Sequence, residues 1–216
     1  MIELYGHPFS SYTWKARIAL LAHGTDHVLK QVDPGHPDNS AFVDAAHPAG
    51  KFPILREGQT VVVEATAIIE WLAVTHRGDA PLIPAHPGEA AMARMLDRVF
   101  DNYLMGNVMR IVEARIANPG QPDPAALEAG GAGLRRAYGW LERWLGEHRL
   151  PNHVSLVTCA AAPALFYADW VEPIGSEAPR VAALRAELLA LQPVVECVNA
   201  ARPYRKLFPG GAPDRD

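Results

Sequence analysis

A polar stretch rich in proline separates two parts of the chain that have different hydrophobic patterns. Pro81, Pro84 and Pro87 lie in this stretch, and proline interrupts both helices and sheets. Before it, short strand-like runs alternate with helical periodicity, whereas every long periodic segment after it repeats at the helical interval. We therefore expect two domains, over residues 1–80 and 88–216.

The first part has the pattern of an α/β domain. Strands are expected at 2–5, 27–32, 52–56 and 60–63, and helices at 11–23, 39–46 and 65–77. The order is strand, helix, strand, helix, two strands and helix. The first two strands should run parallel, because a right-handed crossover joins them through a helix.

The second part has the pattern of an all-α domain. Helices are expected at 89–117, from Asp123 and Pro124 onward, and at 155–171, 178–191 and 193–201. The segment from Ser155 to Val171 is almost wholly apolar, which places it at the centre of the helical bundle. Gly130, Gly131 and Gly133 lower helix propensity and predict a soft stretch.

Composition and charge exclude several kinds of partner. The 216 residues carry a formal net charge of -4, which argues against a nucleic-acid partner because phosphate binding needs clustered Lys and Arg. No apolar run approaches the roughly 20 residues that span a bilayer, and no basic region precedes an apolar run at the N-terminus. Cys159 and Cys197 are interpreted as buried apolar residues in a reducing compartment. We expect a cytoplasmic protein without membrane contact.

Two serines stand where the first strand gives way to the first helix. A helix N-terminus offers unpaired N–H groups and about half a positive charge, so an anion is stabilised there. A hydroxyl at Ser10 or Ser11 either caps the helix or donates to a bound thiolate. This segment alone favours the cap, because serine is a preferred residue there.

A second segment combines a cation with a proline at a strand start. Pro53 opens a strand expected at the centre of the sheet, where proline is disfavoured. It indicates a turn, with a cis Phe52–Pro53 bond as one option, that directs the backbone groups of Phe52 into a cleft. Lys51 either holds a ligand carboxylate or is a solvated surface lysine.

A third segment again joins a strand to a helix. The backbone N–H groups of Ala65 and Thr66 form a second anion site, and Glu64 offers a carboxylate for an ammonium group. Together these sites suit the zwitterionic end of an amino acid. The alternative is that Glu64 only complements the helix dipole.

In this order, the three segments resemble the cytosolic glutathione transferases over nearly the whole chain. Residues 10–20 (SSYTWKARIAL) are similar to the zeta-class signature S-S-C-x-W-R-V-R-I-A-L and to related bacterial serine-type enzymes. The resemblance implies a thioredoxin-like N-terminal domain, a helical C-terminal domain, a homodimer, and glutathione as co-substrate. The implied function is conjugation of the glutathione thiolate to a small hydrophobic electrophile, as in detoxification.

The resemblance also implies residue roles. Ser10 would activate the glutathione sulfur, with Ser11 beside it. Lys51 would hold the glycyl carboxylate, and Phe52 and Pro53 would hold the cysteinyl amide. The residues expected around the γ-glutamyl end are Glu64, Ala65 and Thr66. Those expected to line the electrophile pocket are His7, Phe9, Tyr12, Tyr103, Asn107 and Arg110.

Three departures from the family pattern keep alternatives open. Tyr12 replaces the zeta-class cysteine, which puts a glutathione-dependent isomerase in doubt. Ala65 replaces the usual serine, and Thr158 stands where the helical domain usually has an aspartate that caps a helix. The losses at Ala65 and Thr158 suit a non-catalytic binding or dimerisation module. A thiol–disulfide reductase needs a cysteine at the first helix start, and that helix start has none. No metal-binding motif accompanies the scattered histidines.

Overall fold

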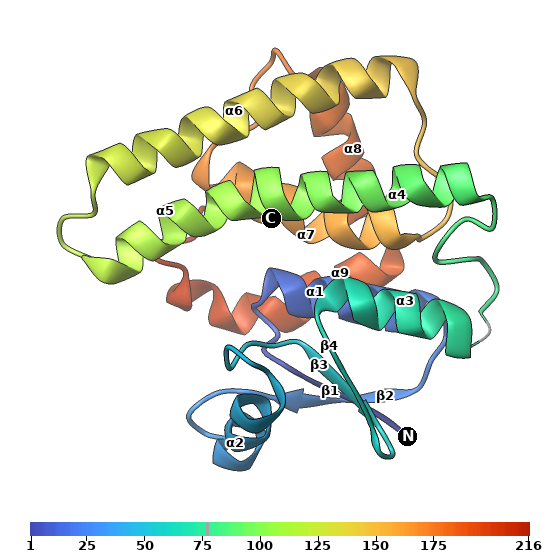
Figure 1. Cartoon of the computed structure of the whole chain (residues 1–216). Helices are drawn as coiled ribbons and strands as arrows, with labels where there is room; N and C mark the ends of the chain where they lie inside the picture. The colour runs from blue at the N-terminus through green and yellow to red at the C-terminus, as the bar shows by residue number, and fades with distance from the viewer. Residues whose placement is uncertain (77) are drawn as a thin grey trace.

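The fold consists of a small mixed sheet with its helices, followed by a larger all-helical part (Figure 1). The computed structural model describes residues 1–76 and 78–216. The strands are β1 (Ile2–Gly6), β2 (His27–Gln31), β3 (Ile54–Glu57) and β4 (Thr60–Val63). The helices among them are α1 (Ser11–Ala22), α2 (Pro37–Ala46) and α3 (Ala65–Thr75). The expected α/β class is confirmed; α3 ends at Thr75, and position 77 lies outside the described residues.

The sheet has the strand order β2-β1-β3-β4. Strands β1 and β2 run parallel, with Ile2 opposite His27, as the crossover through α1 predicted. Strands β3 and β4 form an antiparallel hairpin, and β3 pairs antiparallel with β1. The sheet therefore brings the carboxyl end of β1 next to the start of β3, where the first two candidate segments lie.

The two faces of the sheet pack against different helices. Leu4 joins the main core with residues of α1 and α3, while its neighbour Tyr5 packs on the opposite face against Val43 of α2. This alternation follows from the period of two along a strand. Figure 1 shows α1 and α3 between the sheet and the helical part, with α2 on the outer side.

The expected helix over 89–117 is continuous and contains a π-helical segment. It comprises α4 (Pro87–Val99), a π-helical segment η1 (Phe100–Met105) and α5 (Gly106–Ala117). The partner helix α6 (Pro124–Glu147) begins at the predicted cap, Asp123, whose carboxylate accepts the Ala125 N–H. A Cβ at Gly130 would lie 2.5 Å from Ile111 of α5. The glycines of α6 therefore allow close helix packing.

Helix α7 (Leu156–Val171) is the buried centre of the helical part, as its apolar sequence predicted. Every residue from Leu156 to Trp170 is buried. The Thr158 hydroxyl accepts the Ser155 N–H at 3.2 Å, so threonine supplies the capping contact that aspartate would make. Helices α8 (Pro179–Leu189) and α9 (Gln192–Ala201) follow, and a 3-10 turn, η2 (Arg202–Leu207), leads back toward the sheet.

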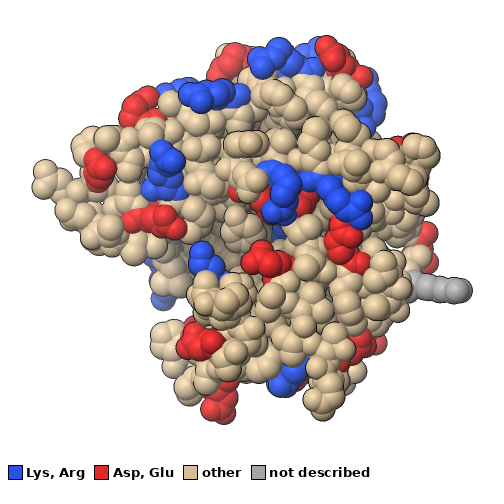
Figure 2. Space-filling view, viewed as in Figure 1, with Lys and Arg blue, Asp and Glu red and all other residues tan. Residues whose placement is uncertain are grey.

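The surface shown in Figure 2 carries both signs of charge interspersed. Acidic and basic side chains lie together near the meeting of α3 and α4, and most of this face is uncharged. Within the described ranges, none of the helices combines the length and the apolar character needed to cross a bilayer.

Candidate active site

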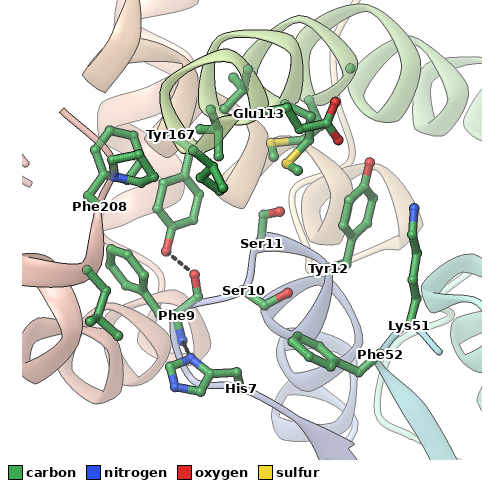
Figure 3. Close-up of a pocket in the computed structure, with 18 of the residues that line it drawn as sticks. His7, Phe9, Ser10, Ser11, Tyr12, Lys51, Phe52, Glu113, Tyr167 and Phe208 are labelled. Atoms are coloured by element: carbon green, nitrogen blue, oxygen red, sulfur yellow. Dashed lines mark hydrogen bonds between the residues drawn. The ribbon is translucent and has the colours of Figure 1, made fainter. Parts of the chain in front are cut away.

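A cavity of about 680 Å³ opens where the end of β1 meets the helical part (Figure 3). Its floor is the loop before α1, its walls are the segment before β3 and one face of η1 and α5, and α7 and η2 close it. The lining residues are His7, Phe9, Ser10, Ser11, Tyr12, Gly50, Lys51, Phe52, Met105, Gly106, Val108, Met109, Val112, Glu113, Ile116, Tyr167, Leu207, Phe208 and Pro209. The predicted residues of the first loop and of the segment before β3 are thus brought together.

Ser10 is the N-cap of α1 and also faces the cavity. Its hydroxyl oxygen accepts the Thr13 N–H at 3.3 Å, and Figure 3 shows the side chain directed into the open space. A hydroxyl has one proton to donate and two lone pairs to accept. The cap contact uses only a lone pair, so the Ser10 proton remains for a bound anion. The cap and the thiolate interpretations are therefore compatible.

Long-range hydrogen bonds hold the loop before α1 in place. The Trp14 indole N–H donates to the Pro8 carbonyl at 2.6 Å, and the Tyr167 hydroxyl donates to the Phe9 carbonyl at 2.8 Å. His7 accepts the Phe9 N–H through Nδ1 at 3.1 Å. Burial lowers the pKa of His7, so this imidazole is neutral at pH 7.

A smaller cavity of about 270 Å³ adjoins the first one and shares Tyr12, Lys51 and Phe52 with it. It is also lined by His47, Pro53, Glu64, Ala65, Arg98, Asp101 and Asn102. The Phe52–Pro53 peptide bond is cis. Acidic and basic groups both border this space, which suits a zwitterion.

Glu64 stands at the start of α3 with an unusual backbone conformation. Its φ is 72°, in the left-handed region that few residues other than glycine adopt. Its side chain is exposed, and Oε1 lies 3.5 Å from Nε2 of His47. Strained backbone of this kind often occurs at functional sites, and here it lies at the rim of the smaller cavity.

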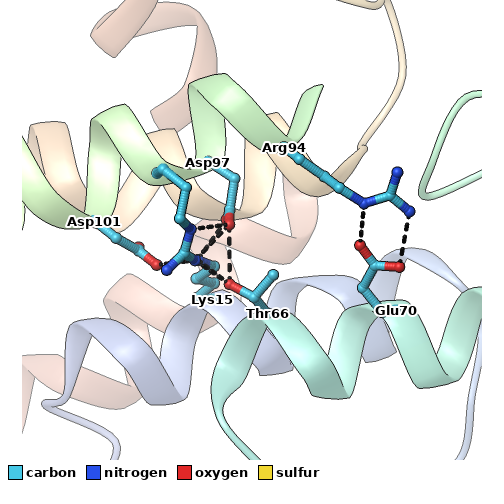
Figure 4. A network of polar contacts seen from close by, with 7 residues as sticks. Lys15, Thr66, Glu70, Arg94, Asp97 and Asp101 are labelled. Atoms are coloured by element: carbon cyan, nitrogen blue, oxygen red, sulfur yellow. Dashed lines mark hydrogen bonds and ion pairs between the residues drawn. The ribbon is translucent and has the colours of Figure 1, made fainter. Parts of the chain in front are cut away.

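A buried charge cluster ties the α3 start to α1 and α4 (Figure 4). The Lys15 ammonium lies 2.5 Å from Asp97 and 2.6 Å from Asp101. The Thr66 hydroxyl accepts from Lys15 and Arg98 and donates to Asp97, so its bonding capacity is filled. Thr66 therefore has no side-chain contact left for a ligand, and only its backbone N–H remains for the predicted role.

Asp101 couples this cluster to the cavities. Burial raises the pKa of its carboxyl above the ordinary value, and the opposing effect of Lys15 and Arg98 is smaller. Burial, with Asp101 nearby, also raises the pKa of Tyr12 to about 12. The Tyr12 phenol therefore stays protonated at neutral pH and can only act as a neutral hydrogen-bonding group.

Three predicted pocket residues lie elsewhere, and that part of the prediction is wrong. Tyr103, Asn107 and Arg110 line a separate groove between α5 and α6. The helical periodicity over 89–117 does not indicate which face of the helix lines the cavity. In the structure these three residues lie on a face of η1 and α5 that borders α6, whereas Met105, Met109 and Val112 lie on the face that lines the cavity.

The sequence reading missed the apolar wall and the ends of the cavity. Met105, Met109, Val112 and Ile116 recur at helical spacing within the expected helix, and that spacing alone does not distinguish a cavity wall from core. Tyr167 and the segment from Leu207 to Pro209 come from distant parts of the chain, so no local pattern could assign them. Among the described residues, no group of three or more His, Cys, Asp or Glu side chains could hold a metal ion.

Comparison with known proteins agrees with this architecture. Residues 4–80 match the family described as "Glutathione S-transferase, N-terminal domain". A probable maleylacetoacetate isomerase of Caenorhabditis elegans is 37% identical over 93 residues, 43% of each chain. FtsZ-localized protein A of Caulobacter vibrioides is 34% identical over 139 residues, 57% of this chain and 59% of that protein. The chain thus spans about two fifths of the length of the first relative and about three fifths of the length of the second.

Solved structures extend the similarity to both parts of the fold. The maleylacetoacetate isomerase of Methylobacterium extorquens, solved with malonate and GSH bound, superimposes with a TM-score of 0.77. The alignment covers 94% of this chain and 98% of that one at 24% identity. Such a likeness shows the fold, and the N-terminal match assigns residues 4–80 to a glutathione S-transferase domain. The N-terminal part of the chain therefore matches the glutathione S-transferase N-terminal domain, and the whole chain has the glutathione transferase fold, with a thioredoxin-like N-terminal domain, a helical C-terminal part and a resemblance to zeta-class members.

Proposed function

We propose that this protein conjugates the thiolate of glutathione to a small hydrophobic electrophile. The observation that carries the proposal is the Ser10 hydroxyl, which caps α1 and still faces a largely apolar cavity beside the smaller charged one. Glutathione fits this pair of spaces, with its γ-glutamyl end at Glu64 and Ala65 and its glycyl carboxylate at Lys51. The electrophile then occupies the apolar wall of η1 and α5.

The chemistry follows from the helix start. The N-terminus of α1 and the Ser10 proton favour the thiolate over the thiol, whose ordinary pKa is about 8.5. The thiol proton leaves to solvent, and the sulfur then forms a bond to the electrophilic carbon. The leaving group departs with the electron pair of the bond that breaks. Tyr12 and Tyr167 stay protonated at neutral pH, since burial raises the pKa of both.

Substitution of Ser10 tests the assignment and separates the thiolate role from the cap. Ser10→Ala should lower kcat/KM for conjugation at least tenfold, about 1.4 kcal/mol of transition-state stabilisation. It should also cost about 1 kcal/mol of stability through the lost cap. Ser10→Asp keeps an acceptor for the Thr13 N–H but places a negative charge beside the sulfur. We expect Ser10→Asp to be as stable as the wild type and as inactive as Ser10→Ala.

Kinetics with a neutral aryl or benzyl halide and urea unfolding provide the two readouts. Ser40→Ala, on α2 away from both cavities, is the matched control and should keep full activity. Full conjugation activity in Ser10→Asp would show that Ser10 is a cap only and would refute the proposed role.

Two alternatives rest on specific observations. The similarity to proteins named maleylacetoacetate isomerase favours glutathione-dependent isomerisation. Ala65 without a hydroxyl, together with the occupied hydroxyl of Thr66, favours a binding module that does no chemistry. Calorimetry with glutathione tests the second alternative. A module that does not bind glutathione gives no heat, whereas a transferase and an isomerase both bind it. The product formed from each electrophile then separates transferase from isomerase.

We further propose that the protein acts in the cytoplasm in detoxification and forms a homodimer. The two free, buried cysteines support a reducing compartment. Exposed apolar side chains on β4, α3 and α4 support self-association, among them Val61, Val74, Met92 and Met95. We also propose residues 1–80 and 88–216 as the two domains.

A further inference from the structure

The larger cavity, where the electrophile is proposed to bind, is lined mainly by apolar side chains and has two charged ones on different walls. Lys51 lies on the wall before β3, and Glu113 lies on α5 (Figure 3). The remaining polar groups are neutral at pH 7, because burial lowers the pKa of His7 and raises the pKa of Tyr12 and Tyr167. The charge that an electrophile meets is thus set by Lys51 and Glu113.

Lys51 is already assigned to the ligand in the proposed function. Its ammonium borders both cavities and is the group expected to pair with the glycyl carboxylate of glutathione. Once that pair forms, the positive charge of Lys51 is neutralised. The electrophile part of the cavity then keeps a single negative group, the Glu113 carboxylate.

The neighbouring cations do not neutralise Glu113. Arg115 donates to the Pro209 carbonyl at 3.0 Å and does not line the cavity. Arg110 borders the separate groove between α5 and α6. No ion pair of Glu113 occurs among the residues that the structure describes.

We propose that Glu113 sets the charge preference of the electrophile site, which accepts neutral and cationic electrophiles and disfavours anionic ones. This inference rests on the proposed conjugation. A negative group in an apolar cavity stabilises a positive substituent nearby and repels a negative one. Substrates that carry carboxylates, such as maleylacetoacetate, are therefore poor partners for this cavity, which favours conjugation over that isomerisation.

Three benzylic chlorides that differ in one substituent test the inference. They are 4-nitrobenzyl chloride, 4-(chloromethyl)benzoate and its trimethylammonium counterpart, so that neutral, anionic and cationic substrates lose chloride in the same reaction. The readout is kcat/KM of each charged substrate divided by that of the nitro compound. Comparing this ratio between variants removes differences in intrinsic reactivity.

Glu113→Gln should raise the ratio for the benzoate about threefold to tenfold and lower the ratio for the ammonium compound by a similar factor. The factor is modest because Glu113 is exposed at the cavity rim and water and salt weaken its field. Glu113→Lys should reverse the preference. The control Glu89→Gln, exposed on the first turn of α4, should leave both ratios unchanged.

Equal ratios in the wild type and both Glu113 variants would overturn the inference. If the wild type conjugates none of the three chlorides, the proposed function fails separately. In that case calorimetry compares binding of S-(4-carboxybenzyl)glutathione and S-(4-nitrobenzyl)glutathione. The inference is supported if Glu113→Gln raises the affinity for the carboxybenzyl compound relative to the affinity for the nitrobenzyl compound. It is overturned if this relative affinity does not change, or if neither compound binds.

Discussion

Ser10 illustrates how one side chain can meet a structural and a chemical requirement together. The hydroxyl oxygen satisfies the Thr13 N–H at the start of α1, and its proton is left for a ligand. From the local sequence, the cap was the favoured interpretation. The tertiary structure adds that the same hydroxyl faces a cavity closed by α5, α7 and η2, which no local pattern could show.

A prediction at this scale concerns Lys51. Lys51→Met should weaken glutathione binding about tenfold, because a charge-assisted hydrogen bond contributes about 1.5–3 kcal/mol and part of it is replaced by water. The same substitution should leave the affinity for a glutathione ester blocked at the glycyl carboxylate nearly unchanged. Calorimetry with both ligands measures the difference, and an equal loss for both would contradict the assigned contact.

The charge cluster around Lys15 shows how helices that are distant in sequence are held in position relative to one another. It joins α1 to α4 and to the start of α3, and Lys15 and Asp97 are each only 1% exposed. A second link on the surface, the Glu70–Arg94 pair, connects α3 to α4 as well (Figure 4). Since Ser10 immediately precedes α1 and Glu64 immediately precedes α3, the cluster fixes the two ends of the proposed ligand site relative to each other.

Removal of the buried cation should destabilise the fold strongly. Lys15→Met leaves Asp97 and Asp101 without their main counter-charge, and the loss of one partner of a buried ion pair costs about 3–5 kcal/mol. Lys30→Met is the matched control, because it removes a lysine from an exposed ion pair. The Lys30 side chain is 37% exposed, and its Nζ lies 3.3 Å from Oε1 of Glu3. We expect the control to cost at most about 1 kcal/mol. Urea unfolding measures both, and similar values for the two variants would show that the cluster adds no more than a surface pair.

Helix α6 shows what packing adds to an expectation that rests on helix propensity. The expectation of a soft stretch at Gly130, Gly131 and Gly133 came from backbone entropy alone. In the fold Gly130 and Gly133 lie against α5, where a side chain at Gly133 would meet Asn107 at 2.2 Å, and Gly131 lies beside Glu172. Packing between elements therefore explains the glycines, and single-sequence propensity does not contain it.

At the scale of the whole molecule, both thiols belong to one continuous core. Cys159 of α7 and Cys197 of α9 are fully buried. Burial raises the pKa of the Cys197 thiol to about 12 and raises that of Cys159 further. At pH 7 neither forms appreciable thiolate, the reactive species.

Thiol titration with a chromogenic disulfide checks this. The native protein should show no rapid reaction, whereas the protein in concentrated urea should titrate two thiols. Buffers between pH 7 and pH 9 should leave the native protein unreactive, since both pKa values lie above this range. A fast-reacting thiol in the folded protein would contradict the burial and would reopen a redox function.

Self-association is the second prediction at this scale. Sedimentation velocity should give twice the mass of one chain. Met92 and Met95 lie one turn apart on α4 and are 43% and 37% exposed, so the double variant Met92→Lys/Met95→Lys should sediment as a single chain. Glu89→Gln on the same helix is the control. A wild type that sediments as a single chain would refute the homodimer.

The sequence by itself determined the strand and helix order, the position of Ser10 at a helix start, and the proline-bearing segment before β3. These features depend on residues close together in the chain, whose periodicity and capping preferences are local. Only the tertiary structure decided which face of the long helix lines the cavity, because that depends on how η1 and α5 pack against segments distant in the sequence. It also decided that Thr66 bonds to the Lys15 cluster and that Glu113 lines the larger cavity, since these contacts join segments far apart in sequence.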